Sequence, residues 1–253
     1  MEKSENKLIS AIIVAAGNAS RLQCGNLKSK GFLLLNGKPL LMYSLEKLAL
    51  LKSLTEIVIV TNDIANTNEL LCKNDLGLLK KINMKVVMGG MSRKDSVYHG
   101  FCNINSSTDL VLIHDVARPL FDLSTVEKCI READLSGAAV MAAPVIDTIK
   151  KAKSDKDKLL VETTLNRNEL YLVQTPQVFR YNLLFEAYKM FNKTANLNSN
   201  ITDEATMLEH LGKAVSLVLS SGNNMKITYP EDLEIVSAVL KKKVKVQKER
   251  VVS

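Results

Sequence analysis

The sequence predicts an α/β protein with a mainly parallel sheet covered by helices on both faces. Apolar runs alternate with amphipathic segments along the first half of the chain, which is the β-α-β order of such sheets. The runs are short and almost wholly apolar, as expected for strands buried on both sides. With 253 residues and 46% hydrophobic content, the chain can bury a substantial core.

The predicted elements follow one another in a regular order. The first strand covers 11–14, and Pro39 opens an amphipathic helix over 40–51. Further strands are expected at 56–61, 84–88, 109–114 and 138–145, and helices at 66–81, 93–103 and 126–133, the last capped by Ser124 with Glu127 at capping-box spacing. Because ligands of such folds bind at the carboxyl ends of the strands, the residues after each strand are the candidate site.

The pattern changes after residue 147. Segments 148–152 and 159–164 flank a charged turn at 153–158, which predicts a β-hairpin arm over about 147–172. An isolated hairpin is marginal in water, so a second subunit is a candidate to cover it. Helices are expected at 181–191 and 203–211, strands at 214–219 and 225–228, and a basic C-terminal helix at about 230–250. With no internal repeat or long linker, residues 1–253 are expected to form one domain.

Composition excludes several classes of protein. No apolar run is long enough to span a membrane, and the polar start MEKSENKL lacks the apolar core of a signal peptide, so we expect a cytoplasmic protein. The four cysteines are scattered without C-x-x-C spacing, which argues against a zinc or redox site. Cys72, Cys102 and Cys129 fall on expected helices and are predicted to fill the core.

The net charge of +7 raises the possibility of nucleic-acid binding. Much of the excess lies in the tail after residue 240, which is typical of a solvated helix end. Aromatic residues make up only 5% of the chain and Trp is absent, which disfavours stacking platforms for single strands. The charge also suits small phosphorylated substrates, so no nucleic-acid partner is expected.

The stretch from Ile9 to Lys30 carries the main candidate site. The small residues Ala15-Ala16-Gly17 follow the first strand, and successive N–H groups in such a turn form a nest for anions. Arg21, Lys28 and Lys30 come next and are the cations that a polyphosphate needs. Neither common phosphate-loop pattern is present, so an ordinary strand-to-helix turn with solvated cations is the alternative.

Several motifs together resemble one family. AAGNASRL, GGMSRKDSV, HDVARP, a later Asp-Thr, Asn-Arg-Asn, QTPQVF, ITDEA and NMKITYPEDL occur in the order seen in 2-C-methyl-D-erythritol 4-phosphate cytidylyltransferases, over about residues 9–240. The resemblance implies a single Rossmann-like nucleotidyltransferase domain and a homodimer joined through the β-arm. It also implies the reaction of CTP with methylerythritol phosphate to CDP-methylerythritol and pyrophosphate, with Mg²⁺ held mainly by the CTP phosphates.

The resemblance carries roles over to individual residues. It implies catalytic roles for Arg21, Lys30 and Lys226, with Lys28 left as an alternative to Lys30. It implies nucleotide binding by Ala15, Ala16, Gly17, Gly89, Gly90, Ser96 and Asp115, and acceptor binding by Arg118, Thr148, Arg167 and Thr202, with Thr175 in the same pocket. The structural alternatives are solvated lysines, plain glycine turns, an Asp115–Arg118 ion pair or helix cap, an exposed hairpin arginine, and Thr202 as a helix N-cap.

The chain departs from the family pattern at four places. It has Ala19 for a second loop Gly, Ser29-Lys30-Gly31 for Pro-Lys-Gln, Met91 for an acidic residue, and Asn166 for the acidic partner of Arg167. These changes spare the cationic groups. Ribitol 5-phosphate cytidylyltransferase, a catalytically silent nucleotide-binding protein and a basic nucleic-acid binder remain as alternative functions.

Overall fold

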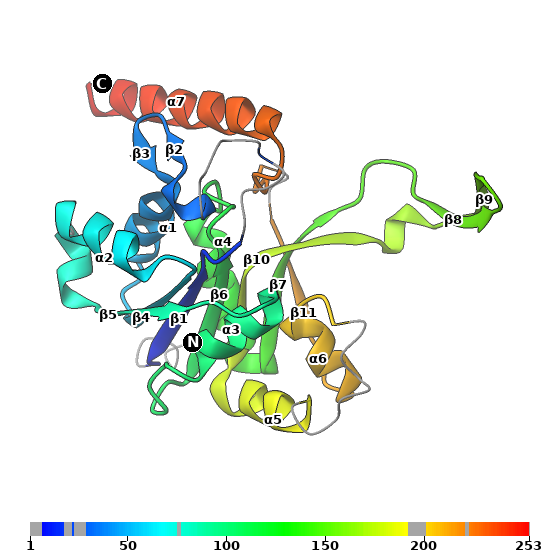
Figure 1. Ribbon diagram of the computed structural model, residues 1–253, viewed down its shortest axis with the longest axis horizontal. Coiled ribbons are helices and arrows are strands. Elements are labelled where there is room, and N and C mark those ends of the chain that lie inside the picture. The colour runs from blue at the N-terminus through cyan, green and yellow to red at the C-terminus, as the bar shows by residue number, and fades with distance from the viewer. Residues whose placement is uncertain are drawn as a thin grey trace.

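A seven-stranded sheet forms the centre of the fold, in the order β11-β7-β10-β6-β1-β4-β5 (Figure 1). The computed structural model describes residues 7–17, 22, 29–74, 77–191, 201–220 and 223–252, with the side chains of the last helix described to 242. The strands are β1 (Ile9–Val14), β4 (Leu54–Thr61), β5 (Asn83–Met88), β6 (Leu110–Asp115), β7 (Ala138–Pro144), β10 (Tyr171–Arg180) and β11 (Ser216–Leu219).

The sheet is mainly parallel, as predicted. Strands β6, β1, β4 and β5 run parallel, and β11 runs parallel to β7. Strand β10 is antiparallel to both β6 and β7. It was not predicted, because Thr175-Pro176 interrupts its sequence. The pairing with β7 shifts register between Val173 and Gln177, so the proline lies outside the regular ladder.

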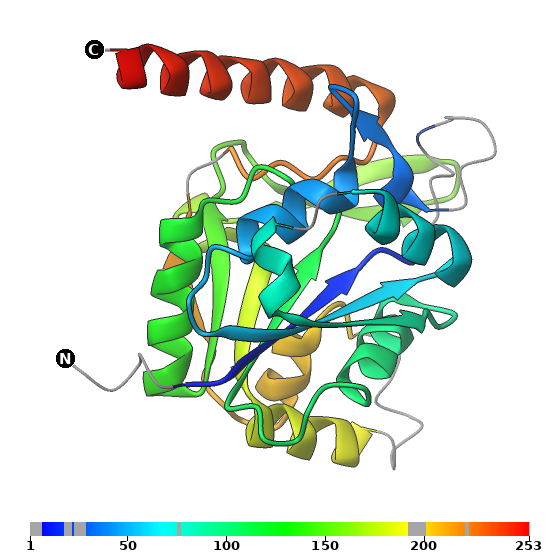
Figure 2. The ribbon, with the colours of Figure 1, turned by 90° about the vertical axis from the view of Figure 1, so that its left-hand side faces the viewer.

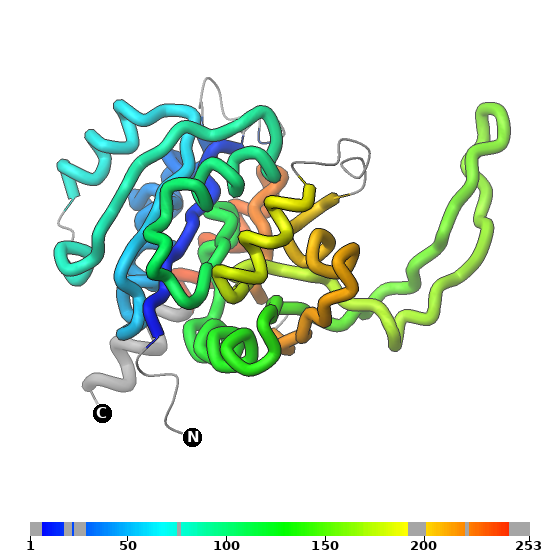
Figure 3. Tube along the Cα trace, turned by 90° about the horizontal axis from the view of Figure 1, so that it is seen from below, coloured from blue at the N-terminus to red at the C-terminus, as the bar shows by residue number. Residues whose placement is uncertain are grey.

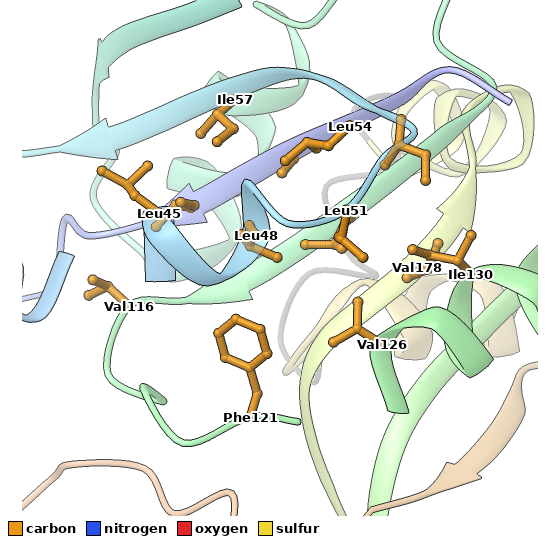
Figure 4. Close-up of a cluster of buried hydrophobic side chains, with 14 of the residues drawn as sticks. Leu45, Leu48, Leu51, Leu54, Ile57, Val116, Phe121, Val126, Ile130 and Val178 are labelled. Atoms are coloured by element: carbon orange, nitrogen blue, oxygen red, sulfur yellow. The ribbon is translucent and has the colours of Figure 1, made fainter. Parts of the chain in front are cut away.

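Helices cover both faces of the sheet. One face carries α1 (Leu40–Leu48), α2 (Ile64–Lys73) and α4 (Leu123–Ser136), and the other carries α3 (Arg93–Phe101), α5 (Tyr181–Phe191) and α6 (Glu204–His210). Successive side chains of a strand point to opposite faces, so Ile13 packs in the first core and Ile12 in the second. Figure 4 shows the first core, to which α1 contributes Leu45 and Leu48 and α4 contributes Val126 and Ile130.

Three predicted boundaries differ from the structure. The helix predicted at 66–81 is α2, which begins earlier because Asp63 caps it, followed by a separate 3₁₀ turn, η3 (Gly77–Lys81). Helix α4 is capped by Asp122, whose carboxylate accepts from the Thr125 N–H, and not by Ser124. Residues 225–228 are not a strand, although the Ile227 N–H donates to the Ala117 carbonyl at 2.8 Å.

A small hairpin and the last helix pack together at one end of the fold. Strands β2 (Leu34–Leu35) and β3 (Lys38–Pro39) are joined by Asn36-Gly37, where both residues have positive φ, as in a tight hairpin turn. The hairpin follows the 3₁₀ turn η2 (Lys30–Phe32). Helix α7 (Pro230–Val252) lies beside it (Figure 2), and the Ser237 hydroxyl donates to the Asn36 side chain at 2.5 Å.

The predicted arm is present and extends away from the rest of the fold (Figures 1 and 3). Strands β8 (Lys150–Asp155) and β9 (Lys158–Thr164) pair antiparallel, and every residue of both is exposed. The turn is tighter than predicted, since only Lys156-Asp157 separates the strands. A short 3₁₀ turn, η4 (Arg167–Glu169), follows.

The cysteine prediction holds only in part. Cys129 is buried on α4, whereas Cys72 and Cys102 are exposed, because they fall on the outward sides of α2 and the end of α3. No helix within the described ranges combines the length and the apolar character needed to cross a membrane.

Candidate active site

A cavity of about 650 Å³ lies at the carboxyl ends of the parallel strands. Most of its lining comes from the ends of β1, β4, β5 and β6 and the segments after them, as predicted for this class of sheet, and Lys226 comes from the segment after β11. The lining residues are Val14, Ala16, Gly17, Lys30, Asn62, Gly90, Met91, Ser92, Arg93, Ser96, Asp115, Val116, Ala117 and Lys226.

Hydrogen bonds at the start of the 3₁₀ turn η2 hold Lys30 at the cavity. The Ser29 hydroxyl donates to the Ala15 carbonyl and also accepts from the Gly31 N–H, which caps η2. Lys30 is only 7% exposed, and its Nζ donates to the Ile227 carbonyl at 2.9 Å. The segment carrying Lys226 is thereby tied to the turn. The predicted residues Arg21 and Lys28 lie outside the described residues, so the alternative between Lys28 and Lys30 stays open.

The Gly89-Gly90 turn requires the absence of side chains. A Cβ atom on Gly89 would lie 2.4 Å from the Ala16 Cβ, and one on Gly90 would lie 2.4 Å from the Asp95 Cβ. The Gly90 N–H donates to the Ser96 hydroxyl at 3.0 Å, so this turn is joined directly to α3. These close approaches within the protein explain why both positions are glycine, and the role of Gly89 and Gly90 in a nucleotide pocket stays a prediction.

Asp115 is the charged centre of the cavity wall. Its Oδ1 accepts from the Nε of Arg93 at 3.1 Å, and its Oδ2 accepts from the Nζ of Lys226 at 2.5 Å. Burial alone would raise the pKa of Asp115, but Arg93 and Lys226 outweigh it and hold the pKa well below its usual range. The carboxylate is therefore ionised at neutral pH. The alternative ion pair with Arg118 is not among the ion pairs of the described residues.

His114 supports Asp115 from behind the cavity. Its Nε2 lies 3.2 Å from the Ser44 hydroxyl, and its Nδ1 lies 3.4 Å from the Thr175 hydroxyl. That hydroxyl accepts from the Asp115 N–H at 3.0 Å. Burial lowers the pKa of His114 to about 3, so the ring is neutral at physiological pH and acts as a fixed hydrogen-bonding group.

The residues predicted to bind the acceptor lie outside the cavity lining, whereas several of those predicted to bind the nucleotide are part of it. Arg118 is half-buried, and its Nη1 donates to the Asn224 carbonyl at 2.8 Å. Thr202 is exposed, and Asp203 rather than Thr202 caps α6, so the N-cap alternative for Thr202 is wrong. Thr148 and Arg167 are exposed on the arm, where Arg167 donates to the Ile146 carbonyl at 2.7 Å. None of these four lines the cavity.

Three further residues were not predicted. Arg93, Asn62 and His114 lie in or beside the cavity wall, and the first and last belong to the motifs GGMSRKDSV and HDVARP. The two motifs indicated that this part of the chain belongs to the site. The sequence does not show which residue a charged or polar side chain after a strand will contact. Asn62 donates to the Ala16 carbonyl at 2.5 Å and so links the segments after β1 and β4.

The side chains of the described residues do not form a metal site made by the protein alone. Across the described parts of the chain, no group of three or more His, Cys, Asp or Glu side chains could hold an ion. Asp115 is the only carboxylate among the described residues that line the cavity, and two cations already engage it.

The fold and the site together define an α/β protein with a mainly parallel sheet and a charged cavity at the carboxyl ends of its strands. The profile of the 2-C-methyl-D-erythritol 4-phosphate cytidylyltransferase family matches residues 9–242. The chain belongs to this family of nucleotidyltransferases, as its motifs predicted. The family-level prediction and the fold class are both confirmed.

Individual relatives agree over nearly the whole chain. A 2-C-methyl-D-erythritol 4-phosphate cytidylyltransferase of Desulforamulus reducens is 40% identical and covers 93% of this chain and 97% of its own length. One from Clostridium botulinum (strain Langeland) is 39% identical, covering 92% and 97%. The crystal structure of the 4-diphosphocytidyl-2C-methyl-D-erythritol synthase of Anaerococcus prevotii has a TM-score of 0.77 at 28% identity, covering 93% and 96%.

Proposed function

We propose that this chain transfers a cytidylyl group from CTP to 2-C-methyl-D-erythritol 4-phosphate, giving 4-diphosphocytidyl-2-C-methyl-D-erythritol and pyrophosphate for non-mevalonate isoprenoid biosynthesis. The observation that carries this proposal is the cavity at the strand ends, whose lining includes Gly90 and the charged side chains of Lys30, Asp115 and Lys226. Family membership over residues 9–242 supports the identity of both substrates.

The proposed chemistry is attack by an acceptor phosphate oxygen on the α-phosphorus of CTP, with pyrophosphate leaving. The nucleophile is already an anion, so no general base is required. Two anions must approach each other, and negative charge grows on the leaving group. Positioning and cationic stabilisation are therefore the main contributions of the protein, and we assign them to Lys30 and Lys226, with Arg21 on the triphosphate.

The walls of the cavity suit a nucleotide. We propose that Ala15, Ala16 and Gly17 face the triphosphate, and that Gly89, Gly90 and Ser96 form the pocket for the base and ribose. The small residues let the main chain approach the ligand closely. Asp115 is proposed to lie at the junction with the acceptor, near Arg118.

Mg²⁺ is the proposed cofactor, held mainly by the CTP phosphates. Mg²⁺, when bound, would supply positive charge that neutralises the phosphate oxygens. The single lining carboxylate among the described residues, Asp115, is consistent with an ion that takes most of its ligands from the nucleotide.

We further propose a homodimer joined through the β-arm. The arm carries exposed apolar side chains, including Leu159 at 78% and Val161 at 61% exposure, and a lone hairpin is marginal in water. A second subunit would bury these side chains and bring Thr148 and Arg167 to the partner's acceptor, together with Thr202 of that subunit. We also expect the chain to act as one domain and to work in the cytoplasm.

The first test measures pyrophosphate release with CTP and Mg²⁺, comparing methylerythritol phosphate with ribitol 5-phosphate. Turnover with methylerythritol phosphate alone supports the proposal. Turnover with ribitol 5-phosphate keeps the chemistry and changes the acceptor. Release with neither acceptor, while CTP still binds, makes a silent nucleotide-binding protein the better description.

A second test addresses the shared site. Arg167→Ala and Lys226→Ala proteins are each expected to be nearly inactive. After subunit exchange, a mixed dimer has one site in which both groups are intact, so some activity returns. No recovery, with exchange confirmed by differently tagged subunits, would contradict the contribution of the arm to the neighbouring site.

A further inference from the structure

A carboxylate outside the cavity is tied to its charged wall. Glu204, at the start of α6, is completely buried and does not line the cavity. Its Oε2 accepts from Nη1 of Arg93 at 3.0 Å, and its Oε1 accepts from the Tyr188 hydroxyl at 3.4 Å. The same Arg93 donates from Nε to Asp115. One guanidinium therefore bridges a carboxylate of the cavity wall and a carboxylate behind it.

The surroundings make the Glu204 position rigid. Tyr188 packs its ring 5.0 Å from both Tyr98 and Phe101, so helices α3, α5 and α6 meet at this point. Burial raises the pKa of Glu204, and the adjacent Arg93 counteracts that rise. A guanidinium beside a buried carboxylate stabilises the ionised form of that carboxylate. The same charge-assisted hydrogen bond holds the guanidinium in place.

The four side chains joined in this way carry charges of alternating sign. Glu204, Arg93, Asp115 and Lys226 form a continuous row from the interior to the cavity, and their formal charges sum to zero. Arg93 has two donors committed to different carboxylates, which fixes the plane of its guanidinium. Asp115 is then shared between Arg93 and Lys226 instead of being drawn wholly to Arg93.

We infer that Glu204 is a positioning residue for the transfer step. Through Arg93 it holds Asp115 where this carboxylate fixes the Lys226 ammonium toward the transferring phosphate. The inference rests on the proposed function, because it takes Lys226 to act on that phosphate. Glu204 itself touches neither substrate, so removing its charge should slow the transfer without weakening nucleotide binding.

The test is Glu204→Gln, which keeps the shape and removes the charge. Arg93 then has only Asp115 as its counter-ion, Asp115 moves toward it, and the row gains one net positive charge. The expected result is a fall in kcat of about tenfold, while the Kd for CTP, measured by calorimetry, is unchanged or lower because the added charge favours a polyanion. A purely structural role would lower the melting temperature and leave kcat per folded molecule unchanged.

Tyr188→Phe is the matched control. It removes the other hydrogen bond to Glu204 without changing any charge, and kcat should stay within about twofold of the unchanged protein. If Glu204→Gln does not fold, Arg93→Lys replaces it. Lysine keeps the charge but cannot bridge the two carboxylates in a fixed plane, so the same loss of kcat with retained CTP affinity is expected.

A double-mutant cycle completes the test. If Glu204 acts only through Arg93, Glu204→Gln has no further effect on kcat in an Arg93→Ala background. Full kcat in Glu204→Gln, or additive losses in the double variant, would overturn the inference while the unchanged protein still turns over. Absence of turnover by the unchanged protein would overturn the proposed function, and the inference with it.

Discussion

Gly89→Ala is expected to destabilise the protein and to weaken CTP binding together. The added Cβ would lie 2.4 Å from the Ala16 Cβ and 2.8 Å from the Oδ1 of Asn62. Carbon atoms in contact normally lie roughly 3.5–4.0 Å apart, so the segments after β1 and β5 would have to separate by more than about 1 Å. Overpacking of this kind costs about 1–3 kcal/mol.

The separation would also disturb the ligand cavity. The Gly89 N–H donates to the Thr61 carbonyl at 2.9 Å, and the Asn62 side chain donates to the Ala16 carbonyl. These contacts set the gap between the proposed triphosphate turn and the base pocket. Moving Gly89 therefore widens the gap, and the affinity for CTP should fall.

The assay pairs denaturant unfolding with CTP titration by calorimetry. Gly17→Ala is the matched control for the unfolding measurement only, because a Cβ at Gly17 meets nothing within 4 Å, while Gly17 itself lines the cavity. Its stability should be unchanged or raised by up to about 1 kcal/mol, since alanine restricts the unfolded chain. A Gly89→Ala protein as stable as the Gly17→Ala protein, with CTP affinity intact, would refute the close approach of these segments.

Two other predictions follow from the charged and buried groups. His114 has a pKa of about 3 in the folded protein against about 6.5 when unfolded, so the unfolded state takes up the proton first. Stability should therefore fall as pH drops from about 6.5 toward 3, by up to about 1.4 kcal/mol per pH unit, and His114→Asn should lose that slope in denaturant titrations. His99→Asn, at an exposed position, is the control. Lys226→Ala should cut turnover by about 10²–10³-fold in the pyrophosphate assay without unfolding the protein, as for loss of a group that stabilises transition-state charge. Lys128→Ala, exposed on α4, should leave turnover unchanged, and near-normal turnover in Lys226→Ala would remove Lys226 from the transfer step.

Short stretches of sequence were enough to predict the elements that form from neighbouring residues. The apolar runs of β1, β4, β6 and β7 are each bounded by polar or turn residues, and their order implies a parallel sheet. The hairpin arm was likewise visible, because two strand-like segments flank a charged turn. By contrast, β10 contains Thr175-Pro176 and is stabilised by pairing with β6 and β7, which are distant in sequence.

Caps show the same division between local and tertiary information. Ser124 and Glu127 have the spacing of a capping box, yet the residue that caps α4 is Asp122, whose carboxylate accepts from the Thr125 N–H at 3.0 Å. Both positions satisfy the local rule. The packing of Val126 and Ile130 on the sheet sets where the helix begins, and this cannot be seen from spacing alone.

The sequence by itself determined the fold class, the arm, the family and the strand ends at which ligands bind, because hydrophobic periodicity and short motifs are local properties of the chain. Only the tertiary structure decided the partners of the charged groups. Asp115 and Lys226 are 111 residues apart in sequence, as are Arg93 and Glu204. Each pair is brought together by the crossing of segments around the sheet. A charged residue that long-range packing buries forms an ion pair with the nearest side chain of opposite charge. The fold determines which residue that is.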